Sequence, residues 1–215
     1  MQMDFDKALK GHSLDRLEEG IYFERLGVCH ESEEKIDEEA FLFGTPRQDA
    51  ECWHLQLEDN SGGIACQTYV IEQLTGEGIS EQELCKKAEH WGFYDPQSGI
   101  STDDLVLMLE KQGFVVEYME DISMRDAMEM LEDGKLLCAV SRIALEDSGM
   151  PQFPGISADC FVELTGIDLS DPANVRAYIN APYDKSGAGK ACSWDAFSAA
   201  WKIGGRAAIY VNRRI

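Results

Sequence analysis

The order of the hydrophobic patterns predicts an α+β fold, in which a helical half is followed by an antiparallel sheet half. Apolar residues recur at helical spacing up to about residue 131, and runs typical of strands follow from about residue 136. Helices in one part of the chain and strands in the next are typical of α+β proteins. The 215 residues are enough for one domain with its own core, so folding needs neither disulfides nor a structural metal.

The clearest predicted helix lies between Ser61 and Gly76. Ser61 is a favourable N-cap, as is Asn60 before it, and Gly76 is a typical stop signal. The helix is entered through two glycines, Gly62 and Gly63. One of its faces is apolar and carries Ala65, Cys66, Tyr69, Val70 and Leu74. Three further helices are expected near residues 80–91, 102–111 and 124–131.

Strands are predicted in the second half of the chain. Strand-like runs lie over residues 136–141, 160–167, 175–180 and 207–211. One more helix interrupts them: it begins at Ser193 and turns Trp194, Phe197 and Trp201 inward. The aromatic face of this helix is expected to belong to the core and not to a ligand site.

The N-terminal part of the chain is strongly acidic. Residues 1–60 carry 16 acidic and 6 basic side chains, and the densest acidic run lies between Glu31 and Glu39. We predict a mainly helical N-terminal extension over residues 1–50, followed by the α+β domain over residues 51–215. The charge is typical of a solvated helical face or a partly flexible segment, and the alternative is an acidic arm that docks on a basic partner.

The net charge of −21 argues against two classes of partner, because such an acidic surface repels nucleic-acid phosphates and the anionic face of a membrane. No run approaches the roughly 20 apolar residues of a membrane span, and the first residues lack the basic and apolar blocks of a secretory signal. We therefore expect a cytoplasmic protein. Basic residues near the C-terminus leave a head-to-tail homo-oligomer open, although a patch neutralised within the same molecule is preferred.

The seven cysteines are odd in number and include no CxxC pair, which argues against a disulfide framework and a zinc finger. Most are expected to be small buried residues. The four histidines, at positions 12, 30, 54 and 90, have no metal-ligand spacing. No metal and no cofactor is therefore predicted.

Three segments carry a family resemblance. The first contains Gln56 and the run from Gly62 to Cys66, the second is the strand from Cys160 to Asp168, and the third is the tripeptide 180–182, Asn-Ala-Pro. Their order and spacing resemble the papain-like cysteine peptidases related to the bacteriocin-leader (double-glycine) processing peptidases. The resemblance runs from about Trp53 to the C-terminus. It implies a papain-like fold with the nucleophile at the N-terminus of a helix.

The same resemblance implies that the catalytic groups are missing. Gln56 matches the family's glutamine, and the position of the nucleophilic cysteine falls on Gly62. The family's histidine falls on Cys160, and its orienting acid falls on Ala181. Acyl transfer in this family needs an activated thiol beside an oriented imidazole, so these three residues imply a degenerate pseudo-peptidase.

We expect such a chain to bind a peptide or protein partner through its inactive cleft. Backbone N–H groups at Gly62 and Gly63, with a side-chain donor from Gln56, are expected to hold a carbonyl or a terminal carboxylate. His54, Cys160 and Asn180 are expected to belong to the same binding site. The simpler interpretation is that the two glycines only let the chain turn into the helix.

Two other functions stay open. In the first, Cys160 or Cys66 is the nucleophile of a hydrolase or transferase, with a non-standard base such as His54. Against this, Cys66 lies on the face of the helix that is predicted to be buried, which favours a core thiol. In the second, the protein is structural and contacts its partner through the acidic extension.

Overall fold

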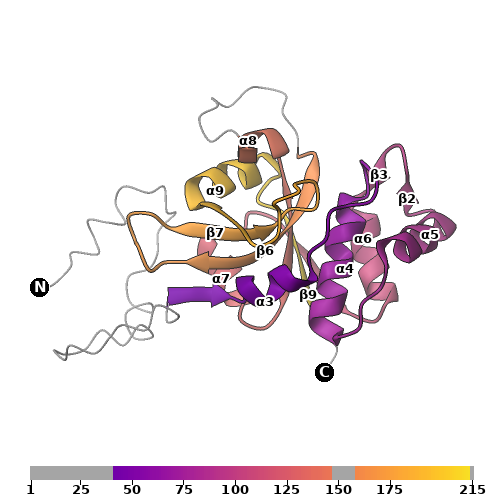
Figure 1. Cartoon of the computed structure of the whole chain (residues 1–215), viewed down its shortest axis with the longest axis horizontal. Helices are drawn as coiled ribbons and strands as arrows, with labels where there is room; N and C mark the ends of the chain where they lie inside the picture. The colour runs from indigo at the N-terminus through magenta and orange to yellow at the C-terminus, as the bar shows by residue number, and fades with distance from the viewer. Residues whose placement is uncertain (1–40, 147–157, 214–215) are drawn as a thin grey trace, which may run out of the picture.

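An antiparallel sheet of seven strands forms one half of the molecule (Figure 1). The structure, a computed structural model, describes residues 41–146 and 158–213. The strands lie in the order β4-β9-β5-β6-β7-β8, and β1 pairs with the end of β6. Their bounds are β1 Leu42–Gly44, β4 Val115–Met119, β5 Lys135–Val140, β6 Cys160–Asp168, β7 Arg176–Asn180, β8 Lys190–Ser193 and β9 Ala208–Asn212.

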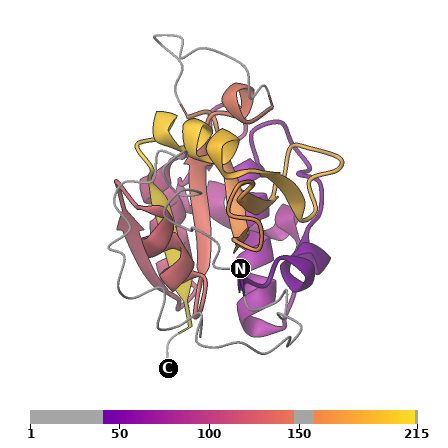
Figure 2. The same cartoon turned by 90° about the vertical axis from the view of Figure 1, so that its left-hand side faces the viewer.

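The helical half packs against one face of this sheet, where α4 contacts β6 (Figure 1). It comprises α4 (Gly62–Thr75), α5 (Glu81–Trp91), α6 (Thr102–Lys111) and the short hairpin of β2 (Tyr94–Asp95) and β3 (Gly99–Ile100). The opposite face is covered by α7 (Met124–Met130), α8 (Arg142–Glu146) and α9 (Trp194–Ile203), the last of which is yellow in Figure 2. The predicted α+β fold is confirmed.

The sheet separates two hydrophobic clusters, because side chains alternate between its faces. On β5, Leu136 and Cys138 belong to the cluster beneath α9, whereas Leu137 belongs to the cluster beneath α4. On β6, Val162 faces α9 and Phe161 faces α4 in the same way. This alternation fixes which residues of β6 can approach the helical half.

Serine N-caps set the starts of several predicted helices. The Ser80, Ser101, Ser123 and Ser193 hydroxyls each accept the backbone N–H of the third helical residue, at the beginning of α5, α6, α7 and α9. Gly76 ends α4 with φ 73°, a left-handed conformation in which glycine is favoured. The helices predicted from periodicity and caps are therefore confirmed, and α6 has the predicted bounds.

Several short elements were not predicted: β1, α3 (Pro46–Asp49), η2 (Ala50–Cys52), the β2-β3 hairpin, β4, α8 and β8. Two of them bear on the predicted domain boundary at residue 50. Strand β1 pairs with β6, and α3 contacts both β6 and β7, so residues 42–50 belong to the sheet half. The rest of the predicted extension, with Cys29, His12 and His30, lies outside the described residues. Within 41–146 and 158–213, no helix has the length and apolar character that crossing a bilayer requires.

Candidate active-site region

The first turn of α4 has no side-chain cap from its N-cap residue, Ser61. The hydroxyl of Ser61, the N-cap residue, donates to Glu58 O at 2.9 Å and accepts from Glu58 N at 3.0 Å. It therefore does not cap the helix, and the first helical N–H groups receive no side-chain acceptor from this residue. Gly62 and Gly63 leave these N–H groups, and the positive end of the helix dipole, uncovered by their own side chains.

A loop from the helical half brings Gln56 next to this entrance. The Gln56 backbone N donates to Pro182 O at 2.9 Å, and the Trp53 indole donates to Ala181 O at 3.0 Å. A Cβ placed on Gly62 would lie 3.0 Å from Gln56 Oε1 and 3.5 Å from Pro182 Cγ. Gln56, Gly62 and the Ala181–Pro182 turn are thus brought together, although they are far apart in sequence.

Glycine is not required at position 62. The contact at 3.0 Å is with the end of the Gln56 side chain and not with backbone, so a shift of a few tenths of an ångström would relieve it, and the φ angle of Gly62 is not in the left-handed region. Gly63 is different, because its Cβ would lie 2.7 Å from Ile100 Cγ2 and 3.3 Å from Phe161 Cδ2. The fold therefore explains the glycine at 63 but does not explain the one at 62.

Cys160 begins β6 on the sheet face away from α4. Its Sγ lies 3.6 Å from Val140 O, and its side chain packs against the cluster that also contains Ala181. The next residue, Phe161, is the one that approaches Gly63. Cys160 and Ala181 therefore share one cluster, and their chain neighbours Phe161 and Pro182 lie against the glycine entrance.

The amide of Gln56 is turned differently from expectation. Its Nε2 donates to Glu58 O and to Asp59 O, both at 2.8 Å, because the loop folds back before α4. These two bonds identify the nitrogen and leave Oε1 toward Gly62. Gln56 therefore presents an acceptor at the entrance instead of the expected donor.

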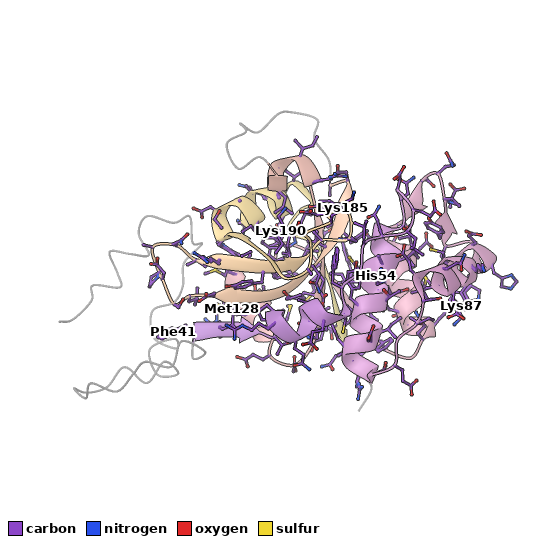
Figure 3. The ribbon with its side chains drawn as sticks, viewed as in Figure 1. Phe41, His54, Lys87, Met128, Lys185 and Lys190 are labelled. Carbon is purple, nitrogen blue, oxygen red and sulfur yellow. The ribbon has the colours of Figure 1, made fainter. Side chains whose placement is uncertain are left out.

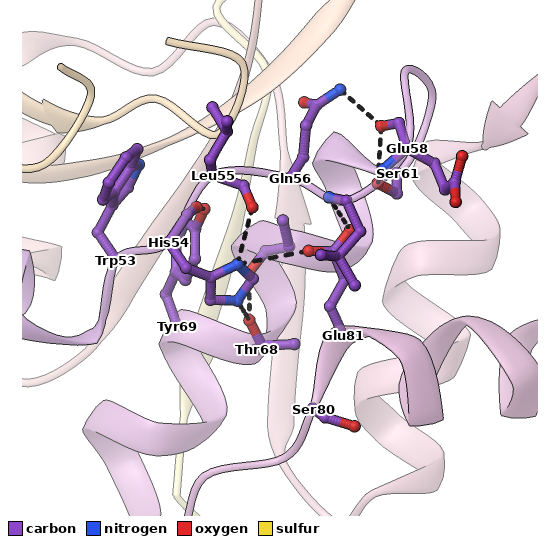
Figure 4. Close-up of polar contacts among 12 residues, drawn as sticks. Trp53, His54, Leu55, Gln56, Glu58, Ser61, Thr68, Tyr69, Ser80 and Glu81 are labelled. Atoms are coloured by element: carbon purple, nitrogen blue, oxygen red, sulfur yellow. Dashed lines mark hydrogen bonds and ion pairs between the residues drawn. The ribbon is translucent and has the colours of Figure 1, made fainter. Parts of the chain in front are cut away.

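His54 is engaged within the helical half, beside α4 (Figures 3 and 4). Its Nε2 lies 2.8 Å from Thr68 Oγ1, and its Nδ1 lies 3.4 Å from Glu81 Oε2. Since the Thr68 hydroxyl donates to Ala65 O, the imidazole must be the donor at Nε2. His54 thus holds its loop to α4 and α5, and it is not placed as a base for Cys160 or Cys66.

Glu81 joins the two ends of the same loop. Its carboxylate is buried, with Oε1 accepting from the backbone N of Leu57 at 3.0 Å and Oε2 lying 3.4 Å from His54 Nδ1. Gln56 lies between these two attachment points, so Glu81 positions the segment that reaches Pro182 (Figure 4).

Asn180 is an interior residue with no exposed surface. Its Nδ2 donates to Glu163 Oε2 at 2.8 Å and to Asp49 O at 3.0 Å, and its Oδ1 accepts from Gly189 N at 2.9 Å. All of these partners are structural, which corrects the expected binding role. The next two residues, Ala181 and Pro182, are the ones whose carbonyls accept from Trp53 and Gln56 at the junction.

Burial makes five of the described thiols, those of Cys52, Cys66, Cys85, Cys138 and Cys192, poorly suited to nucleophilic catalysis. Burial raises the pKa of Cys66 well above its ordinary value, and its Sγ lies 3.6 Å from Phe161 O. Burial likewise raises the pKa of Cys138, and it raises those of Cys52, Cys85 and Cys192 to about 11. A reactive cysteine needs the opposite shift, from an imidazole, a cation or a helix N-terminus. Within the described residues, no three His, Cys, Asp or Glu side chains form a group able to hold a metal.

A buried polar network beside the site was not anticipated. It is formed by Asp49, Gln73, Lys135, Glu163 and Asn180. The available signal was Glu163, a charged residue in the middle of a strand that is otherwise apolar.

Comparison with known proteins assigns the family. Residues 47–185, more than half of the chain, match the model of the papain-like cysteine protease AvrRpt2 family. The chain belongs to this papain-like family. Its matched segment begins in α3 and contains Gln56, Gly62, Cys160 and Ala181.

Two solved structures show the papain-like fold in this family member. The peptidase domain of Streptococcus ComA, a bi-functional ABC transporter involved in a quorum-sensing pathway, is 16% identical with a TM-score of 0.50, over 75% of this chain and 98% of that domain. A C39-like peptidase from Bacillus anthracis is 12% identical with a TM-score of 0.57, over 80% of this chain and 98% of its own. No curated protein sequence matches significantly. The predicted papain-like membership is therefore confirmed, and the likeness to the peptidase domain of ComA and to the C39-like peptidase is confirmed for the fold.

Proposed function

We propose that this protein is a non-catalytic papain-like family member that binds a peptide or protein partner at the entrance of α4. The observation that carries the proposal is Gly62. It begins the helix beside Gln56 and Pro182, where the resemblance places the nucleophilic cysteine, and the fold leaves room there for a side chain.

The described contacts of Cys66, Cys160 and His54 do not assemble a catalytic pair. A thiolate must lie within hydrogen-bond reach of a base. Cys66 is fully buried, the Cys160 thiol faces Val140, and His54 is held by Thr68 and Glu81. The described contacts of His54 are thus with Thr68 and Glu81 and not with the sulfur of Cys160 or Cys66, which weighs against the alternative of a hydrolase that uses either thiol with His54.

Features of the entrance support recognition of a peptide backbone. The first N–H groups of α4 are suited to a peptide carbonyl, and Gln56 Oε1 is suited to a peptide N–H. Two apolar side chains flank Gln56, with Leu55 exposed to 38% and Leu57 to 62%. They offer an apolar contact beside the polar one.

The local charge favours an internal peptide segment over a free C-terminus. Residues 48–85 include six exposed acidic side chains and neither Lys nor Arg. A terminal carboxylate would be repelled by this surface, whereas a neutral backbone or a basic side chain would not. The partner that we propose is therefore a neutral or basic peptide segment in a cytoplasmic setting, and not a nucleic acid or a membrane.

A peptide selection tests the proposal directly. A phage-displayed peptide library is selected on the purified chain, and the Kd of the best synthetic peptide is measured by fluorescence polarisation. We expect the double variant Gln56→Ala, Gly62→Leu to weaken binding by about tenfold or more, because it removes a hydrogen bond and fills the entrance. Gly78→Leu, on the exposed segment after α4, is the matched control and should keep the affinity.

Two outcomes would contradict the proposal. One is an affinity that the double variant leaves unchanged, which would place the peptide elsewhere. The other is cleavage of the selected peptide by the wild-type chain. A chain that begins at residue 41 separates the structural alternative, because loss of binding on deletion of residues 1–40 would assign the contact to the acidic extension.

A further inference from the structure

Glu163 is a fully buried acid in the middle of β6. It lies on the face of the strand toward α4, between the apolar residues Val162 and Leu164, which face the other way. Buried carboxyl groups are rare in proteins unless they are paired with a cation or held in the neutral form. The contacts of Glu163 distinguish these two cases.

Two amide side chains bind one oxygen of Glu163. Gln73 Nε2 donates to Glu163 Oε2 at 3.1 Å and to Asp49 O at 3.3 Å. Asn180 Nδ2 donates to the same two acceptors, at 2.8 Å and 3.0 Å. Gln73 therefore joins α4 to β6, and Asn180 joins β7 to β6. Each of the two amides also bonds the end of α3 through Asp49 O.

Two acceptor oxygens in this cluster remain unmatched. Glu163 Oε1 and Gln73 Oε1 are both buried, and neither has a hydrogen-bond partner among the described residues. Since an ionised carboxylate and an amide oxygen are both acceptors, neither can satisfy the other. A single proton on Glu163 would convert one acceptor into a donor.

The charges of the cluster lead to the same conclusion. Lys135 Nζ lies 2.5 Å from Asp49 Oδ1 and 3.1 Å from Thr45 Oγ1, and Thr45 in turn donates to Asp49 Oδ2. The cation of this cluster is thus paired with Asp49, and none of the described ion pairs involves Glu163. An ionised Glu163 would be a second buried negative charge without its own cation.

We infer that Glu163 is kept as a neutral carboxylic acid, that its Oε1–H donates to Gln73 Oε1, and that this acid–amide pair, together with the Asn180 amide, locks α4, β6 and β7 together. These elements carry Gly62 on α4 and Cys160 on β6, and Ala181 directly follows β7. The hydrogen bond formed by the inferred proton therefore holds together the elements that build the candidate site. The inference does not depend on what the site binds.

The surroundings of Glu163 support this protonation state. Burial, and next to it the negative charge of Asp49, raise the pKa of Glu163 from 4.5 to about 8, while Lys135, Asn180 and Gln73 oppose the rise. The thiols that interact with Glu163 are those of Cys52, Cys66 and Cys138, and burial raises the pKa of each. All three thiols are neutral at pH 7, so they add no charge to the cluster.

The sign of the pH effect follows from the raised pKa. Between pH 4.5 and about 8 the folded chain holds a proton on Glu163 that the unfolded chain has lost. The free energy of unfolding therefore falls as the pH rises through this range. Above about pH 8 both states have lost the proton, so Glu163 lowers the stability no further. The tie between α4, β6 and β7 should be strongest below pH 7.

Glu163→Gln tests the inference, because glutamine imitates the protonated acid with one donor and one acceptor. We compare urea unfolding of the wild type and the variant from pH 5.5 to 7.5. The unfolding constant of the wild type, divided by that of the variant, should rise by about tenfold per pH unit, or about 100-fold over the range. Glu77→Gln, on the exposed segment after α4, is the control and should follow the wild type.

A ratio that stays within about threefold over this range would overturn the inference, because one linked proton requires a tenfold change per unit. Asp49→Asn should lower the free energy of unfolding, since it leaves Lys135 buried without its carboxylate. If Glu163→Gln does not fold, infrared spectra decide, with Asp49→Asn as the control because burial also raises the pKa of Asp49. A protonated-carboxyl band at pH 6 that Asp49→Asn retains and that disappears by pH 9 supports the inference, and the absence of this band at pH 6 contradicts it.

Discussion

The family resemblance assigns position 62 to the nucleophile and position 160 to the imidazole, so it predicts that a chain with Gly62→Cys and Cys160→His contains a thiol that alkylates at pH 6 at least about 100-fold faster than the thiol of Gly62→Cys alone. An adjacent imidazole stabilises the thiolate, and a helix N-terminus adds to this effect. The structure has room for the new thiol, because only the end of the Gln56 side chain lies at 3.0 Å from the Cβ position. The rates are measured with iodoacetamide by mass spectrometry of the peptide that contains residue 62.

Gly62→Cys with Cys160→Gln is the matched control, because glutamine fills a similar volume without a base. It should alkylate at the rate of Gly62→Cys alone. Equal rates for the histidine and glutamine variants would mean that positions 62 and 160 do not meet. The assignment of Cys160 to the place of the family's histidine would then be wrong.

Trp201→Ala should lower the free energy of unfolding by about 3–5 kcal/mol, the range for truncating a large aromatic residue in a core. Trp201 is 1% exposed, and its indole N–H donates to Ala207 O at 2.8 Å. Its ring centroid lies 5.4 Å from that of Phe197 and 6.4 Å from that of Trp194, so truncation opens a cavity between α9 and the sheet. Urea unfolding measures the change.

Trp91→Ala provides the comparison, because this tryptophan lies on the surface of the helical half, where it is 37% exposed and contacts Lys111 and Phe93. Its loss should cost about 1 kcal/mol or less. Similar costs for the two substitutions would show that α9 does not pack on the sheet as described.

Local signals in the sequence predicted the helices well. Gly76 and the apolar face before it predicted α4, although the Ser61 hydroxyl does not cap this helix, and Ser101 with the spacing of Leu105, Met108 and Leu109 predicted α6. Such signals act over a few residues, so they need no knowledge of the rest of the fold. Strand β4 was missed because its Val115 and Tyr118 are exposed and its pattern lacks a buried stripe.

The polar interior could not be predicted in the same way. Asn180 reaches Asp49 across 131 positions of the sequence, and Gln73 reaches Glu163 across 90. Pairs this distant have no local pattern, and a strand position next to the presumed acid at Ala181 suggested a binding role for Asn180 instead. Only the fold shows that its side chain is enclosed by structural partners.

For the site, the spacing of Gln56 and Gly62 predicted that they lie together, and they do. The direction of the Gln56 amide was not predictable, since it depends on the carbonyls of Glu58 and Asp59. The position of His54 depends on Glu81, which comes from another helix. Residue identity therefore indicated the place of the site, whereas tertiary contacts decided what each side chain presents to it.

The central claim is that the protein has no catalytic thiol, and alkylation of the wild type tests it most directly. The chain is treated with iodoacetamide at pH 7, and each cysteine-containing peptide is followed by mass spectrometry, with casein hydrolysis measured in parallel. For Cys52, Cys85 and Cys192, whose pKa burial raises to about 11, we expect rates about 20-fold below that of free cysteine, rising with pH. Cys66 and Cys160 should also show no fast reaction, and casein should stay intact. Rapid labelling of Cys160 or Cys66, with hydrolysis that Cys160→Ser or Cys66→Ser abolishes, would contradict the account and identify a working enzyme.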